Sequence, residues 1–183
     1  LIKIANDLRL LSSGPRTGFA EIILPAVQPG SSIMPGKVNP AMAEMLNMVC
    51  FQVIGNDLAV AMAAQAGQLE LNVMMPVINH NLLQSLEILK NGVKAFTERC
   101  VNGIKADKAR CREFAEKSVG LATVLNPFIG YEKAAVVAKE AVITGKTIRE
   151  IVLKRGILSK KEVDKIFNPM AMTRPGIIKR RRI

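Results

Sequence analysis

The residues best suited to chemistry lie together in the run GSSIMPGKVNP, from Gly30 to Pro40. The run holds two hydroxyl groups, one cation and one amide, without the apolar periodicity of a helix or strand. Its glycines permit backbone conformations that other residues avoid, and its prolines restrict the chain. We therefore predict a loop that is held in place rather than a flexible linker. Its backbone amides and Lys37 could converge on a carboxylate.

The elements around this loop are predicted to be helices. Of 183 residues, 49% are hydrophobic but only 4% aromatic, which favours helices packed on helices over a sheet sandwich. Apolar spacing predicts a helix ending near Ser12 and two long helices, 40–66 with Asn39 as its cap and 74–103. Both faces of the first long helix are apolar, so we expect it inside a larger bundle and we expect oligomerisation.

Shorter helices are predicted after Gly103, and they suggest a second domain. Their ranges are 107–117, 131–143 and 147–154, with a last helix capped by Ser159 and carrying Glu162 at the capping-box position. The predicted fold class is all-α, a long-helix bundle followed by a small helical domain. We expect residues 1–108 to form part of the bundle, including the loop 28–40, and residues 109–183 to form the small domain with a basic tail.

The positive charge of the chain is confined to its second part. Residues 1–100 carry seven basic and seven acidic side chains, whereas residues 101–183 carry nineteen basic and eight acidic ones, a net of +11. Solvated helix faces explain most of this excess, and only Lys179 to Arg182 forms a tight run. Because aromatic residues for base stacking are few, we do not expect nucleic acid as a partner, although the basic part keeps that alternative open.

Cysteine use and hydropathy indicate a cytoplasmic protein. The three cysteines are odd in number and lack metal-ligand spacing, so we expect mostly buried thiols, no metal and no cofactor. Polar residues interrupt the most apolar region, so we expect no membrane-spanning segment. These residues are Asn47, Gln52, Asn56 and Asp57. The chain opens on Leu1 inside a helical pattern, so we expect an amino-terminal part to be missing.

The run GSSIMPGKVNP, a long helix and then GQLELNV together resemble the fumarase/aspartase superfamily, in its aspartate ammonia-lyase and class II fumarate hydratase branches. Gly36 and Val38 on either side of Lys37 are similar to the form of the motif in these branches. The stretch LNPFIGY, residues 125–131, is similar to the start of their small carboxy-terminal domain. The resemblance implies a homotetramer with a twenty-helix core, and active sites that are each built from three subunits.

The resemblance also implies a reaction, the reversible anti elimination across a carbon-carbon bond of a small dicarboxylate. Ser31 matches the base, while Ser32, Lys37 and Asn39 match residues that hold the carboxylates. Because a serine hydroxyl is a weak acid, nearby cations and loop amides must lower its pKa. Glu70 in the ELN stretch is implied to pair with a histidine of another subunit. A carboxylate favoured by a helix dipole explains Glu70 equally well.

The choice of substrate rests on few residues. The run from Ala41 to Glu44 is similar to aspartases, which favours elimination of ammonia from L-aspartate to give fumarate. A class II fumarate hydratase acting on malate is the alternative, and Met75 supports neither. A helical assembly module without activity is a further alternative. The single histidine, His80, lies in an apolar helical pattern, so we interpret it as structural and not as catalytic.

Overall fold

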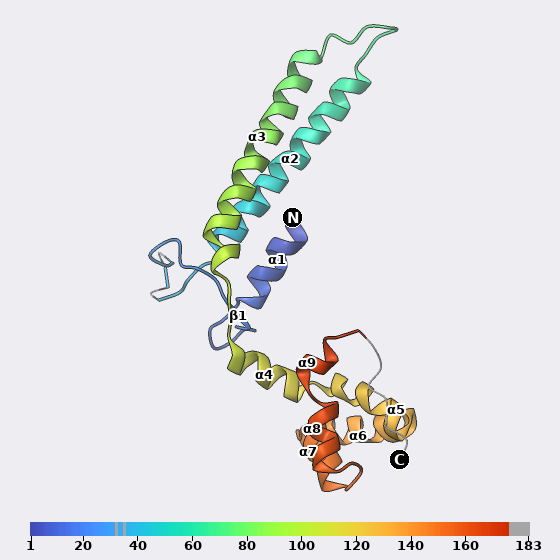
Figure 1. The fold of residues 1–183 in the computed structure, drawn as a ribbon. Coiled ribbons are helices and arrows are strands. Elements are labelled where there is room, and N and C mark those ends of the chain that lie inside the picture. Colours follow the sequence, from blue (N-terminus) through green and yellow to red (C-terminus); the bar gives the residue numbers. More distant parts are fainter. Residues whose placement is uncertain (32, 35, 176–183) are drawn as a thin grey trace. The chain divides into compact units, whose positions relative to one another are not determined.

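The computed structural model describes residues 1–31, 33–34 and 36–175 (Figure 1). Ser32 and the basic run from Lys179 to Arg182 therefore lie outside the described residues. The only strands in the described ranges are two of two residues each. Most of the described residues lie in helices, which confirms the all-α prediction. The chain divides into two compact units, Leu1–Asp107 and Lys108–Ile183.

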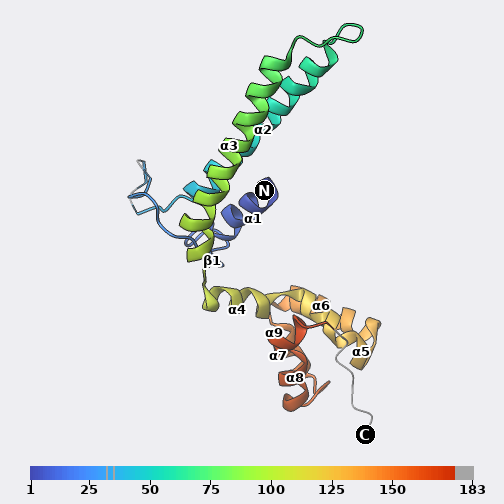
Figure 2. The same ribbon diagram turned by 45° about the horizontal axis from the view of Figure 1, so that its top comes forward.

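The first unit is built on a long helical hairpin, seen end to end in Figures 1 and 2. Its elements are α1 (Ile2–Leu11), β1 (Ile22–Ile23), α2 (Ala41–Gln65), α3 (Met75–Arg99), the 3-10 turn η1 (Val101–Gly103) and β2 (Lys105–Ala106). The two strands pair antiparallel, with Ile22 opposite Ala106. The prediction that Asn39 caps α2 is wrong. The helix begins after Pro40, whose carbonyl accepts the amides of Ala43 and Glu44, and no side chain caps it.

Two contacts set how α2 and α3 pack. At Gly92 a Cβ atom would lie 3.3 Å from a Val49 methyl group, so the helices approach closely there. Further along, buried Asn56 of α2 donates its amide to Gln84 Oε1 and Ser85 Oγ of α3, each at 3.0 Å. A buried amide that is bonded across two helices favours one register over others. At the other end, α1 packs on α2 around a small core. This core consists of Ala5, Ala43, Leu46, Cys50, Phe96 and Cys100.

Much of the hairpin surface is apolar and exposed. Large hydrophobic side chains that stand in solvent run along both helices. On α2 they are Met48, Phe51, Ile54, Leu58 and Met62, and on α3 Met75, Val77, Leu82, Leu83, Leu86 and Val93. A contiguous apolar surface of this kind is typical of a face that packs on other protein. The arrangement agrees with the prediction of a helix that belongs inside a larger bundle.

By length and composition, α2 is the one helix of the described residues that could cross a membrane. Its best 18-residue window has a mean hydropathy of 1.4, so the polar residues do not lower the hydropathy as far as we expected from the sequence. The core helix of a soluble protein has the same properties, which makes this weak evidence. Asn47 and Asn56 are instead bonded to α1 and α3, as in a helix packed against protein.

The second unit closes around a core of its own. Its elements are α4 (Lys108–Lys117), the 3-10 helix η2 (Val119–Leu125), α5 (Asn126–Ile129), α6 (Tyr131–Thr144), α7 (Ile148–Lys154), α8 (Lys160–Ile166) and α9 (Pro169–Met172). Ile148, Ile151 and Val152 of α7 are fully buried against α6, α8 and η2. The predicted capping box of Ser159 and Glu162 is confirmed, and Thr147 with Glu150 forms another. The helix after Ser159 is not the last, because Asn168 caps α9.

Candidate active site

The loop from Gln28 to Pro40 is folded back on itself. The Ser31 amide donates to the Lys37 carbonyl at 3.0 Å, and the Lys37 amide donates to the Met34 carbonyl at 3.2 Å. Gly30 has a φ of +127° and Gly36 a φ of +80°, a region that favours glycine. A Cβ at Gly30 would also lie 3.0 Å from the Lys37 carbonyl oxygen. The glycines of the motif are therefore needed for the conformation that brings Ser31 and Lys37 together.

The hydroxyl oxygen of Ser31 receives two backbone hydrogen bonds. The amide of Ile33 donates to Oγ at 3.2 Å and the amide of Met34 at 3.1 Å, and Ser31 is half-buried. Amide dipoles that point at one oxygen stabilise negative charge on it. The loop thus provides two donors for the alkoxide form of Ser31, which is the form that could remove a proton from carbon.

Lys37 and Asn39 lie on the same loop. Lys37 is exposed and makes no ion pair with any other described residue, so its charge is available to an anion. Asn39 is half-buried, and α2 does not use its side chain as a cap. Three of the predicted residues, Ser31, Lys37 and Asn39, are therefore carried by one loop. The fourth residue predicted there, Ser32, lies outside the described residues.

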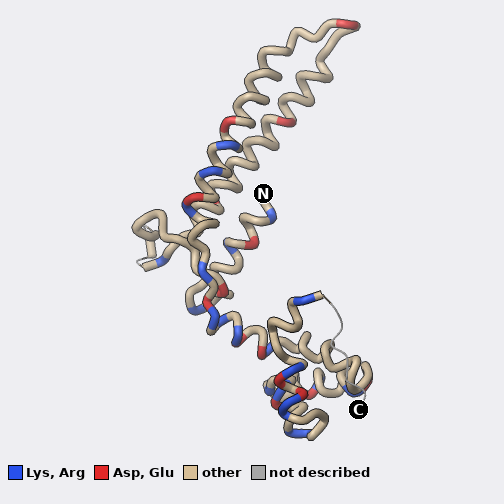
Figure 3. The backbone as a smooth tube through the Cα atoms, viewed as in Figure 1, with Lys and Arg blue, Asp and Glu red and all other residues tan. Residues whose placement is uncertain are grey.

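Glu70 lies far from this loop. It sits in the turn between α2 and α3. Figure 3 shows this turn at the tip of the hairpin, whereas the loop leads into the opposite end of α2. The 25 residues of α2 span about 37 Å at 1.5 Å per residue. The turn is closed by hydrogen bonds between Gln68 and Leu71, and Glu70 is exposed. Within one chain, Glu70 and Ser31 cannot take part in the same site.

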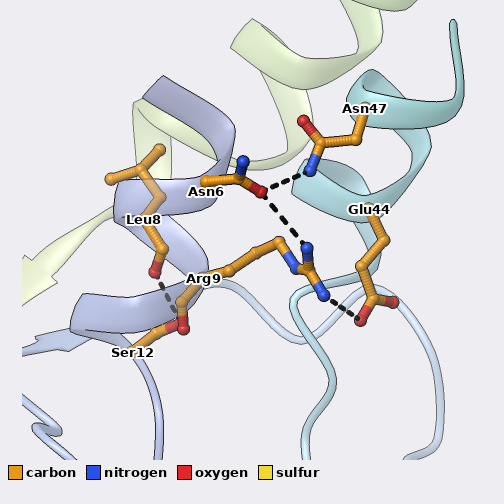
Figure 4. Close-up of polar contacts among 6 residues, drawn as sticks. All are labelled: Asn6, Leu8, Arg9, Ser12, Glu44 and Asn47. Carbon is orange, nitrogen blue, oxygen red and sulfur yellow. Dashed lines mark hydrogen bonds and ion pairs between the residues drawn. The ribbon is translucent and has the colours of Figure 1, made fainter. Parts of the chain in front are cut away.

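A carboxylate that we did not single out lies at the loop end of the hairpin. Glu44 in the first turn of α2 is 3.9 Å from Arg9 of α1, and Arg9 also donates to Asn6 Oδ1 at 3.3 Å (Figure 4). Asn47 donates to the same oxygen at 2.8 Å. The sequence signal was the position of Glu44, four residues after the motif ends, which we used only to compare substrates. These contacts hold the first turns of α2 against α1. Since the loop ends where α2 begins, they also hold the end of the loop.

Other candidate chemistries find little support in the described residues. No group of three or more potential ligands among them could hold a metal ion. Cys50 and Cys100 are buried free thiols and Cys111 is partly buried. The prediction that the cysteines are mostly buried thiols is therefore confirmed. Burial raises the pKa of the Cys100 thiol, which disfavours the reactive thiolate. His80 is exposed on α3 and distant from the loop in sequence. The loop remains the best candidate for catalysis.

Comparisons with known proteins place this loop in a family. Residues 1–55 match the family described as Lyase, and residues 121–174 match the family described as Fumarase C C-terminus. The chain is 57% identical over 175 residues to the aspartate ammonia-lyase of Bacillus subtilis, covering 96% of this chain and 37% of that protein. It is 53% identical over 174 residues to that of Escherichia coli, covering 95% and 36%.

Solved structures give the same picture. A fumarate lyase:delta crystallin from Brucella melitensis, bound to cobalt, superimposes with a TM-score of 0.89 at 53% identity, over 95% of this chain and 38% of that one. A class II fumarase from Schistosoma mansoni has a TM-score of 0.85 at 44% identity, over 93% and 36%. This chain thus spans little more than a third of the length of its relatives, yet matches them over nearly its whole length. It belongs to the fumarase/aspartase superfamily.

Proposed function

We propose that this chain is part of an enzyme that reversibly eliminates ammonia from L-aspartate to give fumarate. The named relatives at 53–57% identity are aspartate ammonia-lyases, which supports this substrate. The observation that carries the proposal is the pair of backbone amides that donate to Ser31 Oγ, because they stabilise the form of serine that this reaction needs. The charge of Lys37 on the same loop suits a dicarboxylate.

In the proposed reaction Ser31 acts as the base. Its alkoxide removes a proton from the carbon beside one carboxylate of aspartate, and the electron pair left on carbon moves onto that carboxylate. The pair then returns to form the carbon-carbon double bond, while ammonia leaves from the neighbouring carbon. Because negative charge accumulates on the carboxylate, donors fixed around its oxygens lower the barrier most. Lys37, Asn39 and Ser32 are the proposed donors, and the reaction needs no cofactor.

We also propose that the site is completed in a homotetramer. The exposed apolar faces of α2 and α3 are surfaces that other copies of a bundle could cover. Glu70 cannot reach Ser31 of its own chain, so any role for its carboxylate lies in the site of another subunit, where it would orient a histidine. The unpaired, buried thiols of Cys50 and Cys100 favour a reducing compartment, and we propose a cytoplasmic location.

Class II fumarate hydratase is the second candidate. The similarity to the fumarase of Schistosoma mansoni over 93% of this chain favours it, since the loop chemistry of hydration and deamination is the same. The two activities differ in the leaving group, which is ammonia in one and water in the other. In the proposed mechanism the loop residues do not contact this group. Parallel assays of the complete protein with aspartate and malate distinguish them, and turnover of malate alone would reject the aspartate proposal.

The test of the base is Ser31→Ala in the complete protein. We expect kcat to fall by about 10³-fold or more, because loss of a general base costs on the order of 10²–10⁴ and no other described residue of the loop carries a hydroxyl. Sedimentation velocity should show an unchanged assembly. Ser118→Ala is the matched control, since Ser118 lies outside the loop and its side chain caps no helix. Turnover retained within tenfold in Ser31→Ala would reject Ser31 as the base.

A further inference from the structure

The second unit contains a hollow that the proposed reaction does not use. It lies between α5, α6 and the segment after α7, and its volume is about 810 Å³. It is open to solvent, so a ligand there would lie on its wall rather than be enclosed. All of its lining residues belong to the unit Lys108–Ile183, whereas the catalytic loop belongs to Leu1–Asp107.

Most of the residues that line the hollow are hydrophobic, and polar atoms share its surface. Five of its lining side chains are hydrophobic, namely Phe128, Ile129, Val136, Val137 and Ile157. Val137 is fully buried, and Phe128, Ile129 and Ile157 pack against the core of the unit, so the wall rests on fixed structure. Val136 is half exposed to solvent. A hydrocarbon group in this place would remove apolar surface from water on both partners.

Two cations complete the lining, Lys133 of α6 and Arg155 after α7. Arg155 Nη2 lies 2.5 Å from Glu140 Oε2, an ion pair that holds the guanidinium while leaving several of its five N–H donors unused by that oxygen. Lys133 makes no ion pair with another residue of the described ranges. With one acid against two bases, this part of the hollow favours an anion.

We propose that the hollow binds a medium-chain monocarboxylate, with its hydrocarbon tail on the apolar wall and its carboxylate at Lys133 and Arg155. The combination selects this class of ligand. A dicarboxylate as small as fumarate would leave most of the hydrophobic lining uncovered. An uncharged hydrocarbon or alcohol would leave the two cations unused. This site is independent of the proposed lyase activity.

Equilibrium dialysis of the protein with octanoate at neutral pH tests the proposal. We expect saturable binding with one site per chain. Lys133→Glu should weaken it about tenfold or more, because it replaces a charge-assisted contact by repulsion. Val136→Asp should weaken it comparably by placing a carboxylate in the wall. Both side chains are exposed, so neither change disturbs the core. Lys139→Glu makes the same change of charge on α6 outside the hollow, and should leave the affinity within twofold.

Ligand controls separate the two parts of the site. Octanol, which has the tail without the charge, and succinate, which has two carboxylates on a short chain, should each bind about tenfold more weakly than octanoate. Absence of saturable octanoate binding would overturn the proposal. So would equal affinity for octanol or succinate, or equal affinities of the Lys133→Glu and Lys139→Glu proteins.

Discussion

The two units of this chain bury their side chains very differently. In the first unit, α3 is 25 residues long and buries only Gly92 and Phe96. In the second unit, α7 has seven residues and buries Ile148, Ile151 and Val152. Apolar residues are abundant in both, but in the hairpin many of them face solvent. The second unit is therefore closed around its own core, whereas the first offers its apolar surface to other protein.

The candidate site lies in the less covered of the two units. Ser31 and Lys37 belong to the unit whose long helices are incompletely covered, so the loop is held locally by its own hydrogen bonds and at its end by α2. Glu70 at the far end of the same hairpin cannot contribute to this loop. We infer that assembly of several chains both covers the hairpin and completes the site, while the second unit folds by itself.

The largest effect is expected from a charge on the exposed face of the hairpin. Phe51→Asp places a carboxylate on the apolar surface of α2, where Phe51 is 57% exposed in the single chain. If other copies cover this face, each buried carboxylate costs several kcal/mol, and the complete protein should lose the proposed tetramer and the proposed activity. Sedimentation velocity measures the assembly.

The matched control for this change lies in the second unit. Val142 of α6 is 69% exposed, more than Phe51, and Val142→Asp should leave assembly and activity intact. An unchanged assembly in the Phe51→Asp protein would mean that other copies do not cover the hairpin face.

The next effect concerns the core of the second unit. Ile151 is fully buried, and Ile151→Ala should lower the free energy of unfolding by about 2–5 kcal/mol through lost burial and a residual cavity. Urea denaturation followed by circular dichroism measures the change. Leu153→Ala, two residues along α7 and 39% exposed, should cost about 1 kcal/mol or less. If the two variants lost similar free energies of unfolding, the proposal that Ile151 belongs to a separate core of this unit would be wrong.

Local patterns explain what could be predicted from the sequence. The capping box of Ser159 and Glu162 was found because its two residues are three positions apart and its signal is local. The long helices followed from apolar spacing, and the loop from its run of glycines, prolines and polar residues. The motif also predicts a shared site for Ser31 and Lys37, and the loop joins the two residues by a backbone hydrogen bond.

Contacts between distant residues could not be predicted in this way. Arg9 meets Glu44 only because α1 packs on α2, and no periodicity reports such a pair. Strands β1 and β2 pair across more than 80 residues, and each is too short to leave a pattern. The cap of α2 was misjudged because Asn39 is a good cap by type, but the helix begins one residue later than that cap requires.

A smaller effect should follow from the buried amide between α2 and α3. Asn56→Ala leaves Gln84 and Ser85 without their bonds to Asn56, which should cost about 1–3 kcal/mol in the free energy of unfolding. Asn79→Ala on the exposed surface of α3 is the control and should change it by about 0.5 kcal/mol or less. Equal effects of the two variants in urea denaturation would show that the hairpin does not depend on this network for its register.

The smallest effect depends on pH and concerns the cap of α7. Hydrogen bonds from the Thr147 backbone amide, and next from its hydroxyl, hold the pKa of Glu150 below the ordinary 4.5. A carboxyl whose pKa is lowered by folding stabilises the folded state above its unfolded pKa, and this contribution is lost as the pH falls through the folded value. Glu150→Gln should therefore lower Tm near neutral pH, and the difference from the unchanged protein should shrink as the pH falls below 4.5.

Glu87 in the hairpin provides the comparison for this last measurement. Its pKa is also lowered, first by the Asn91 side chain and then by Lys90, on the exposed surface of α3. Ordering two exposed side chains around a carboxylate costs conformational entropy, whereas the Thr147 amide is already fixed by the backbone. The pH-dependent difference in Tm should therefore be smaller for Glu87→Gln than for Glu150→Gln. A larger pH-dependent difference for Glu87→Gln would contradict this expectation. It would mean that exposed side-chain donors on the hairpin stabilise a carboxylate at least as well as the cap of α7 does.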